Sequence, residues 1–358
     1  MDDSASTNQA IEIKNQELKD LALKVRNSVI PDALEESILI RLGQLDKLVS
    51  SAAYLPEFDS ITRYINWVSK IPWGKKTEDI LDLEKARKVL DSHHYGLMEI
   101  KDRVLEYLSV MKLKIEKGEG SELGRAPILF FVGLVGTGKT TIAFSIAEAM
   151  GRKIARIPFG GMEDPLDLRG KSRMHAEAEP GKVIKALIDT QSLNPVILLD
   201  EIDRVTDAGR SSIMGVLVEL LDPKQNNRFV DHYVDYPTDL SQVLFIGTAN
   251  NTHRIATAVM DRLEPIAMPS YTDEEKISIG KKYVLPEKLK AAGIPAGGLM
   301  ISDDIWPNVV RPLGYDAGIR TLERTIDQIV RRVAKMIVEG KATSVTVSPE
   351  NIKEFIQR

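Results

Sequence analysis

Residues 127–150, PILFFVGLVGTGKTTIAFSIAEAM, join a short apolar run, a glycine-rich loop and a second apolar stretch with helical spacing. The first seven residues are typical of a buried parallel strand, and the last nine predict a helix. Between them, Gly133, Gly138, Lys139 and Thr140 match G-x-x-x-x-G-K-[ST] in the strand, loop and helix context that this pattern requires. The stretch therefore predicts a phosphate-binding loop at the edge of a parallel α/β sheet.

Each part of this loop has an expected role. Glycines let the backbone aim several N–H groups at phosphate oxygens, and the helix N-terminus adds its positive end. Lys139 is expected to reach the β and γ phosphates and Thr140 to bind Mg²⁺, so ATP or ADP with Mg²⁺ is the predicted cofactor. The alternative, a flexible turn before a helix, is the weaker interpretation. The expected contacts come from Gly133, Gly136, Thr137, Gly138, Lys139, Thr140 and Thr141.

Two further apolar runs, PVILLDEID and QVLFIGTANN, end in polar residues. After the first, Asp200 is expected to hold Mg²⁺ through water and Glu201 to polarise the attacking water. After the second, Thr248 and Asn250 lie where an amide can position that water. Taken alone, an acidic pair commonly starts a helix and an asparagine commonly forms a turn. Together with the phosphate loop, they predict a site of nucleotide hydrolysis.

Composition narrows the class of protein. The 358 residues are 43% hydrophobic, which is enough for more than one core, and the net charge is −4, which does not favour nucleic acid as a partner. There is no cysteine, so disulfides, thiolate metal sites and a cysteine nucleophile are excluded. A polar, acidic start and the lack of a long apolar run favour a soluble, cytoplasmic protein without a membrane segment.

The chain divides into three expected parts. Residues 1–72 show helical spacing, as in Leu34, Ile38, Leu42 and Leu45, and end near a Pro–Trp–Gly stretch. Residues 73–268 alternate apolar runs with helical patterns, which implies a parallel sheet with helices on its faces. Residues 269–358 are mostly helical, and they end in a short predicted strand and a helix with Ser348 as its N-cap.

Two arginines have open interpretations. Arg262, in VMDRLEP, is either half of a surface ion pair or a finger that completes the site of a neighbouring subunit. Arg320 precedes an apolar stripe that is most simply core, and it can face the nucleotide itself.

The order of motifs resembles the ATPase module of the Lon family of AAA+ proteases over most of the chain. The resemblance rests on IPWG, DSHHYGLMEIKDRVLEYLSV, GLVGTGKTT, NPVILLDEID, LLDPKQNNRFVDHY, FIGTANN, MDRLE and DAGIRTLER. It implies a P-loop AAA+ fold with a large α/β nucleotide domain, a small helical lid after it and a helical N-terminal segment before it. It also implies Asn250 as first sensor, Arg262 as arginine finger and Arg320 as second sensor, with Tyr95 and Gly96 closing over the adenine.

The resemblance implies partners as well. Modules of this kind form six-membered rings, bind nucleotide between subunits and move a central loop that pulls unfolded polypeptide toward a protease chamber. We therefore expect a homo-oligomer, hexameric in the full-length context, with polypeptide substrates. The family's serine and lysine protease domain should begin about where this sequence ends, so we expect no proteolysis from these residues and a protease domain or partner outside them.

The expected pore loop departs from the family pattern. Relatives carry an aromatic and then an aliphatic residue between RG and PGK, whereas KSRMHAEAE here places His175 and Ala176 at those two positions. Rigid aromatic side chains hold varied polypeptides well because they offer contact area at low entropic cost, which alanine cannot match. The usual grip is therefore expected to be absent, although His175 could retain part of it.

Three functions follow from these patterns. The leading one is a Lon-type ATPase ring subunit that drives polypeptide unfolding and translocation. The second is a nucleotide-responsive interaction module whose pore loop no longer grips a substrate. The third is a DNA-handling AAA+ motor, which the acidic balance and the blocks LLDPKQNNRFVDHY and DAGIRTLER oppose.

Overall fold

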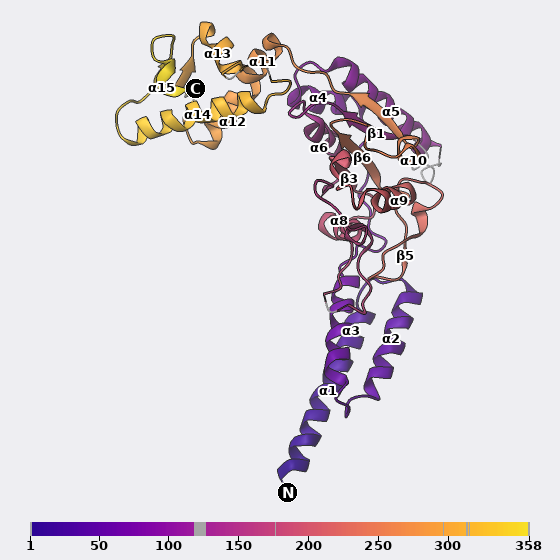
Figure 1. Cartoon of the computed structure of the whole chain (residues 1–358). Helices are drawn as coiled ribbons and strands as arrows, with labels where there is room; N and C mark the ends of the chain where they lie inside the picture. The colour runs from indigo at the N-terminus through magenta and orange to yellow at the C-terminus, as the bar shows by residue number, and fades with distance from the viewer. Residues whose placement is uncertain are drawn as a thin grey trace.

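The computed structural model describes residues 2–117, 127–175, 177–295, 297–312, 314 and 316–356, with side chains from residue 12 onward. Three helices form an elongated stalk, a sheet covered by helices on both faces follows, and a mostly helical lid ends the chain (Figure 1). Within the described residues, no helix combines the length and the apolar character that crossing a membrane would require.

The stalk confirms the predicted helical start of the chain. It consists of α1 (Asp2–Arg26), α2 (Asp32–Asp46) and α3 (Tyr54–Val68). The α2 positions predicted to be apolar face inward, as Leu34, Ile38, Leu42 and Leu45 are all buried. The base of the stalk belongs to the same hydrophobic cluster as one face of the sheet, and Trp73 packs edge-on against Tyr236 there.

The predicted parallel sheet is present, with strand order β2-β3-β6-β1-β7. All four pairings in it are parallel. Its strands are β1 (Ile128–Val132), β2 (Ile154–Pro158), β3 (Val196–Asp200), β6 (Leu244–Ala249) and β7 (Leu263–Ala267). Because parallel strands share one carboxyl edge, the loops after β1, β3 and β6 converge there, at the usual ligand position of such sheets.

Helices cover both faces of the sheet, as expected for parallel strands. One face packs on α4 (Leu83–His93), α5 (Met98–Glu116) and α6 (Lys139–Met150). The other face packs on α7 (Leu166–Arg169), α8 (Lys182–Thr190), α9 (Arg210–Leu220) and α10 (Thr257–Met260). The connections contain η2 (Ile202–Arg204), η3 (Asn226–Arg228) and the antiparallel pair β4 (Phe229–Val230) and β5 (Pro237–Thr238).

The lid has a hydrophobic cluster of its own, around Trp306 and Ile326. Its elements are α11 (Asp273–Ile279), η4 (Gly280–Val284), α12 (Leu285–Ala291), β8 (Leu299–Ile301), η5 (Asp303–Ile305), α13 (Trp306–Val310), α14 (Arg320–Val338), β9 (Val345–Val347) and α15 (Ile352–Phe355). The predicted last strand is β9, but the expected cap at Ser348 is wrong. The N-cap of α15 is Asn351 instead, since the helix begins only at Ile352. Residues 348–351 form a turn before it, in which the Ser348 N–H donates to the Asn351 side-chain oxygen at 2.8 Å.

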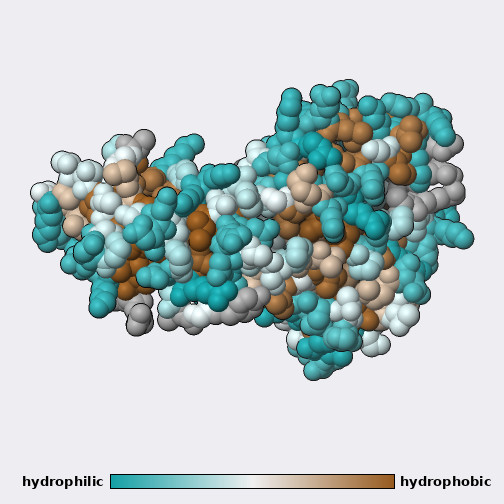
Figure 2. Space-filling view, turned by 90° about the horizontal axis from the view of Figure 1, so that it is seen from above, coloured by the Kyte–Doolittle hydropathy of each residue, from teal (hydrophilic) through white to brown (hydrophobic). Residues whose placement is uncertain are grey.

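The lid meets the sheet domain at the phosphate loop. Seen from above, the two form separate masses joined by a narrower neck (Figure 2). At the contact, the Ile319 N–H donates to the Gly136 carbonyl at 3.1 Å, and the Tyr271 hydroxyl donates to the Thr137 carbonyl at 3.4 Å. The start of α14 is thereby held against the loop that the sequence predicts to bind phosphate.

Candidate nucleotide site

The phosphate loop runs from the end of β1 into α6. Gly138, the N-cap of α6, has φ of 94°, a left-handed conformation that glycine adopts without strain. A Cβ on Gly133 would lie 2.6 Å from the Met268 carbonyl oxygen, so the adjacent strand end leaves room only for glycine. These two positions explain the glycine spacing of the motif in physical terms.

Lys139 lies over the loop at the first position of α6. Its ammonium donates to the carbonyls of Gly133 and Leu134 at 2.7 and 2.8 Å, and to the Asn250 side-chain oxygen at 3.2 Å. Burial lowers the pKa of Lys139, and the nearby Asp200, Asp203 and Glu201 carboxylates oppose that shift. The lysine thus links the phosphate loop to the ends of β3 and β6.

Asp200 ends β3 with its carboxylate almost fully buried, at 3% exposure. Its Oδ1 accepts the Thr248 hydroxyl at 2.5 Å and the Thr140 hydroxyl at 3.3 Å. The Arg156 guanidinium holds Oδ2, with Nε at 2.7 Å and Nη2 at 2.5 Å. The sequence predicted the neighbourhood of Thr140 and Asp200 but not the Arg156 contact.

The pairing of Thr140 with Asp200 tests whether Mg²⁺ fits this site. A hydroxyl and a carboxylate oxygen on neighbouring elements are hard oxygen donors, which Mg²⁺ prefers alongside water and substrate phosphates. Within the described residues, no group of three or more His, Asp or Glu side chains forms a metal cage of its own. The donor set therefore fits a magnesium ion that phosphate oxygens help to hold.

Glu201 follows Asp200 in a left-handed conformation, with φ of 57°. The Thr248 hydroxyl oxygen accepts its backbone N–H at 2.9 Å, and its carboxylate pairs with Arg204 at 3.0 Å. A non-glycine residue with positive φ is uncommon, and such residues gather at functional sites. Here the positive φ occurs at the residue that directly follows β3 and lines the cavity described below.

Asn250 is held by a buried carboxylate that the sequence analysis did not single out. Oδ2 of Asp203, which is 4% exposed, accepts the backbone N–H groups of Asn250 and Asn251 at 3.2 and 3.3 Å. Asp203 therefore fixes the backbone of the segment that follows β6. An acid three residues after the β3 strand end was the available signal, but its partners lie almost fifty residues along the chain.

A cavity of about 170 Å³ brings most of the predicted site together. The cavity is lined by the phosphate loop, by the acidic pair after β3, by Asn250 after β6 and by the start of α14 in the lid. Its lining residues are Val135, Gly136, Gly138, Lys139, Thr140, Thr141, Asp200, Glu201, Asn250, Ile319, Arg320 and Glu323. Glu323 is an addition to the predicted set, and burial raises the pKa of its carboxyl.

Five residues predicted for the nucleotide site lie outside this lining set, which are Gly133 and Thr137 of the phosphate loop, Arg262, Tyr95 and Gly96. Arg262 pairs with Asp222 at 3.0 Å and donates to the Ala258 carbonyl at 2.6 Å, within its own chain. Tyr95 packs against the lid cluster with the Lys282 ammonium 5.5 Å from its ring centroid, and Gly96 lies beside Glu275. The roles of Arg262 at a neighbour's site and of Tyr95 and Gly96 at the adenine stay predictions.

The predicted pore loop projects between α7 and α8. His175 is exposed, and its N–H donates to the Ser172 carbonyl at 3.0 Å, which forms a tight turn. Ala176 lies outside the described residues. Arg173 stacks over the Tyr64 ring of α3 at 4.2 Å and pairs with Asp235 at 3.4 Å, so the loop contacts the stalk.

Asp231 anchors the base of this loop from a fully buried position. Its Oδ2 accepts the Gly181 N–H at 2.7 Å, and its Oδ1 accepts those of Tyr233 and Val234 at 2.8 and 3.1 Å. A Cβ on Gly170 would lie 2.6 Å from Oδ1, so both ends of the loop meet this carboxylate. Burial raises the pKa of Asp231 to about 6, against the backbone hydrogen bonds that lower it.

This pKa predicts a pH-dependent stability. Because the folded pKa is above 3.8, the contribution of Asp231 is fully present below about pH 4 and is lost as the pH rises to about 6. Between about pH 4 and about pH 7, the free energy of unfolding of the wild type should fall by about 2 kcal/mol relative to Asp231→Asn. Urea titrations at both pH values measure the difference.

The matched control for this prediction is Asp235→Asn, which changes an exposed carboxylate in the same loop. The difference in free energy of unfolding between the wild type and Asp235→Asn should be similar at both pH values. A difference between wild type and Asp231→Asn that stays constant over the same range would contradict the raised pKa of Asp231.

Comparisons with known proteins agree with this geometry. Residues 129–270 match the ATPase family associated with various cellular activities (AAA), and residues 290–345 match the Lon protease AAA+ ATPase lid domain. The chain is 40% identical to a Lon protease of Lawsonia intracellularis over 96% of its own length and 40% of the relative's. It is also 40% identical to Lon protease 1 of Bacillus subtilis, over 96% of this chain and 43% of that one.

Each of these relatives matches nearly the whole of this chain but less than half of its own length. A third relative, Lon protease 2 of Thermus thermophilus, is 38% identical over 95% of this chain and 43% of its own length. The chain thus spans about two fifths of the length of the curated relatives that it matches. The AAA match and these relatives support an ATP-driven activity. With its AAA domain, its Lon-type lid and this similarity along nearly the whole chain, the sequence is an AAA+ ATPase module of the Lon family.

Proposed function

We propose that this module binds ATP with Mg²⁺ and hydrolyses it as one subunit of a ring. The observation that carries the proposal is the single cavity lined by Lys139, Asp200, Glu201, Asn250 and Arg320. A phosphate-binding lysine, a carboxylate suited to Mg²⁺, a candidate base and two polar sensors are the parts that phosphoryl transfer to water requires. We propose the same three parts as before: a helical N-terminal segment at 1–72, the nucleotide domain at 73–268 and the lid at 269–358.

The proposed chemistry assigns one role to each side chain. Lys139 and the loop N–H groups hold the β and γ phosphates, and Thr140 and Asp200 hold Mg²⁺, which neutralises charge on the phosphates. Glu201 removes the proton of the attacking water, while the Asn250 amide orients that water. Arg320 reaches the phosphates from the lid, so closure of the lid reports the state of the nucleotide to the rest of the chain.

Arg262 is proposed to act in a neighbouring subunit. Its pairing with Asp222 and with the Ala258 carbonyl pre-orients the guanidinium on the surface of its own chain. The side chain is still 26% exposed, which leaves part of it for a partner. The resemblance to Lon supports a hexameric ring in the full-length context, unfolded polypeptides as substrates and a protease domain or partner outside these residues.

The direct test measures nucleotide binding and hydrolysis by the purified chain. Lys139→Ala is the blank, because it removes the ammonium between the phosphate loop and Asn250. We expect Mg²⁺-dependent ATP hydrolysis by the wild type and loss of both nucleotide binding and turnover in the variant. Equal turnover by wild type and Lys139→Ala would contradict the proposal.

A second function is favoured by the pore loop. The stacking of Arg173 on Tyr64 and its pairing with Asp235 tie the loop to α3 and to a neighbouring turn. A loop held in this way, with histidine and alanine at the gripping positions, suits a nucleotide-responsive interaction module that does not thread polypeptide.

A substitution in this loop separates the two functions. His175→Tyr supplies an aromatic side chain at an exposed position, so in a threading machine it should raise the stimulation of ATPase activity by an unfolded polypeptide several-fold. Met174→Tyr, one residue away and also exposed, is the matched control. Stimulation of the wild type and both variants to the same extent, or of none of them, would favour the interaction module.

A further inference from the structure

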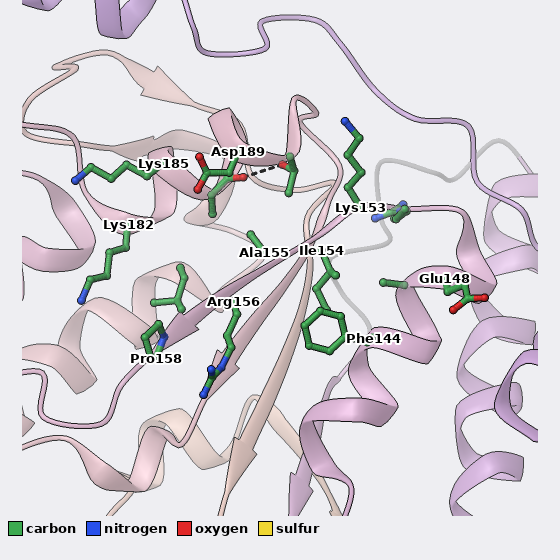
Figure 3. Close-up of a pocket in the computed structure, with 15 residues that line it drawn as sticks. Phe144, Glu148, Lys153, Ile154, Ala155, Arg156, Pro158, Lys182, Lys185 and Asp189 are labelled. Carbon is green, nitrogen blue, oxygen red and sulfur yellow. Dashed lines mark hydrogen bonds between the residues drawn. The ribbon is translucent and has the colours of Figure 1, made fainter. Parts of the chain in front are cut away.

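A groove lies beside the edge strand β2, which pairs with β3. It encloses about 760 Å³ between α6, β2 and α8, and its wall includes Phe144, Ile154, Arg156, Lys182, Lys185 and Asp189 (Figure 3). Because β2 is at the edge of the sheet, its outer side has no strand neighbour among the residues that the structure describes. Arg156 projects from this strand and is 51% exposed at the groove.

Strand register explains why Arg156 meets Asp200. Pro158 pairs with Asp200 and Arg156 pairs with Leu198, so Arg156 is two residues before the partner of Asp200. Side chains two residues apart point to the same face of a sheet, and diagonal neighbours lie within reach of a long side chain. The guanidinium thus crosses from the solvent-exposed groove to a carboxylate that is only 3% exposed.

The groups that bind the Asp200 carboxylate occupy the oxygens that Mg²⁺ would need. Oδ1 accepts the Thr140 and Thr248 hydroxyls, and Oδ2 accepts Arg156. A buried carboxylate without a partner is costly, so the guanidinium stabilises Asp200 when no metal is bound. A divalent cation at the same carboxylate meets the positive charge of Arg156 at close range and therefore binds against its repulsion.

We infer that Arg156 is a positioning residue that holds the Asp200 carboxylate in competition with Mg²⁺, and so sets the Mg²⁺ concentration at which nucleotide binds tightly. The inference rests on the proposed function, because it concerns the same metal site. The half-exposed guanidinium faces the groove, which gives it space to turn away from Asp200 as the metal enters.

The test follows binding rather than turnover. A fluorescent ADP analogue is held at fixed concentration with the whole chain, and Mg²⁺ is titrated in wild type, Arg156→Gln, Arg156→Lys and Lys153→Ala. We expect Arg156→Gln to lower the Mg²⁺ concentration at the midpoint by roughly tenfold. The coupling energy between two charges at close range corresponds to a change in affinity of at least this size. Arg156→Lys, which keeps the charge but loses the planar fork, should fall between it and wild type.

Lys153→Ala is the matched control. Lys153 lines the same groove, and its replacement by alanine removes one positive charge, as Arg156→Gln does. Its midpoint should equal that of the wild type. An unchanged or raised midpoint in Arg156→Gln, or an equal shift in Lys153→Ala, would overturn the inference.

Two further readouts keep the outcomes separate. Circular dichroism and binding of the analogue without Mg²⁺ establish that each variant is folded, and Arg156→Lys carries the test if Arg156→Gln is not. If the wild type binds no nucleotide at any Mg²⁺ concentration, the proposed function fails and takes the inference with it. If the wild type binds and only the midpoint shift is missing, the inference alone fails.

Discussion

Replacing Glu201 by glutamine is expected to lower ATP turnover by about 10² to 10⁴-fold, the range that a positioned general base contributes, while nucleotide binding stays nearly unchanged. Glutamine keeps the size of the side chain and can still accept the Arg204 hydrogen bond, which is 3.0 Å in the wild type. It cannot take a proton from water. Phosphate release under steady-state conditions measures turnover, and equilibrium titration with a fluorescent nucleotide measures binding.

The control for this experiment is Glu339→Gln, which removes a carboxylate at the far end of α14 that pairs with Lys341 at 2.6 Å. It should hydrolyse ATP at the wild-type rate. If Glu201→Gln also did so, the base would have to be another residue of the cavity, and the half-buried Glu323 would be the next candidate.

Replacing Arg262 by alanine is expected to lower turnover by about 10³-fold or more, because an arginine finger stabilises charge that appears only in the transition state. Nucleotide binding by the isolated subunit should persist, since Arg262 is not among the residues that line the cavity of its own chain. Arg254→Ala, which removes another arginine that pairs with a surface carboxylate, is the matched control and should be active.

Mixing two inactive variants tests whether Arg262 acts on a neighbour. An Arg262→Ala subunit keeps an intact Glu201, and a Glu201→Gln subunit keeps an intact Arg262. In random rings of equal parts, about a quarter of the subunit interfaces combine both intact residues, because such interfaces are heterologous. Partial recovery of turnover on mixing is the expected result. No recovery, in mixtures shown to co-assemble, would contradict action in trans.

The sequence predicted best what depends on local order. The phosphate loop, the acidic pair after β3 and the polar end of β6 each follow an apolar run, and parallel strands bring those three ends to one edge. The inward stripe of α14 was also predictable, because Leu322, Ile326, Ile329 and Val333 recur at helical spacing. The two domain matches and the Lon relatives confirm the family that these motifs suggested.

What the sequence did not predict depends on contacts between distant residues. The sequence analysis did not single out Arg156, because only the pairing of β2 with β3 brings it to Asp200, forty-four residues away. Glu323 enters the cavity because α14 begins against the phosphate loop, which no local pattern reveals. The sequence analysis did not single out Asp231 either, because its raised pKa follows from burial in the folded chain.

The most direct test of the central claim is ATP hydrolysis by the purified chain over a wide range of protein concentrations, with nucleotide binding measured alongside. If assembly completes the site through Arg262, the rate per subunit should rise with concentration and reach a plateau as rings fill. That plateau should be absent in Arg262→Ala. A rate per subunit that is the same at every concentration, or nucleotide binding with no turnover at any concentration, would contradict an active site completed between subunits of this chain.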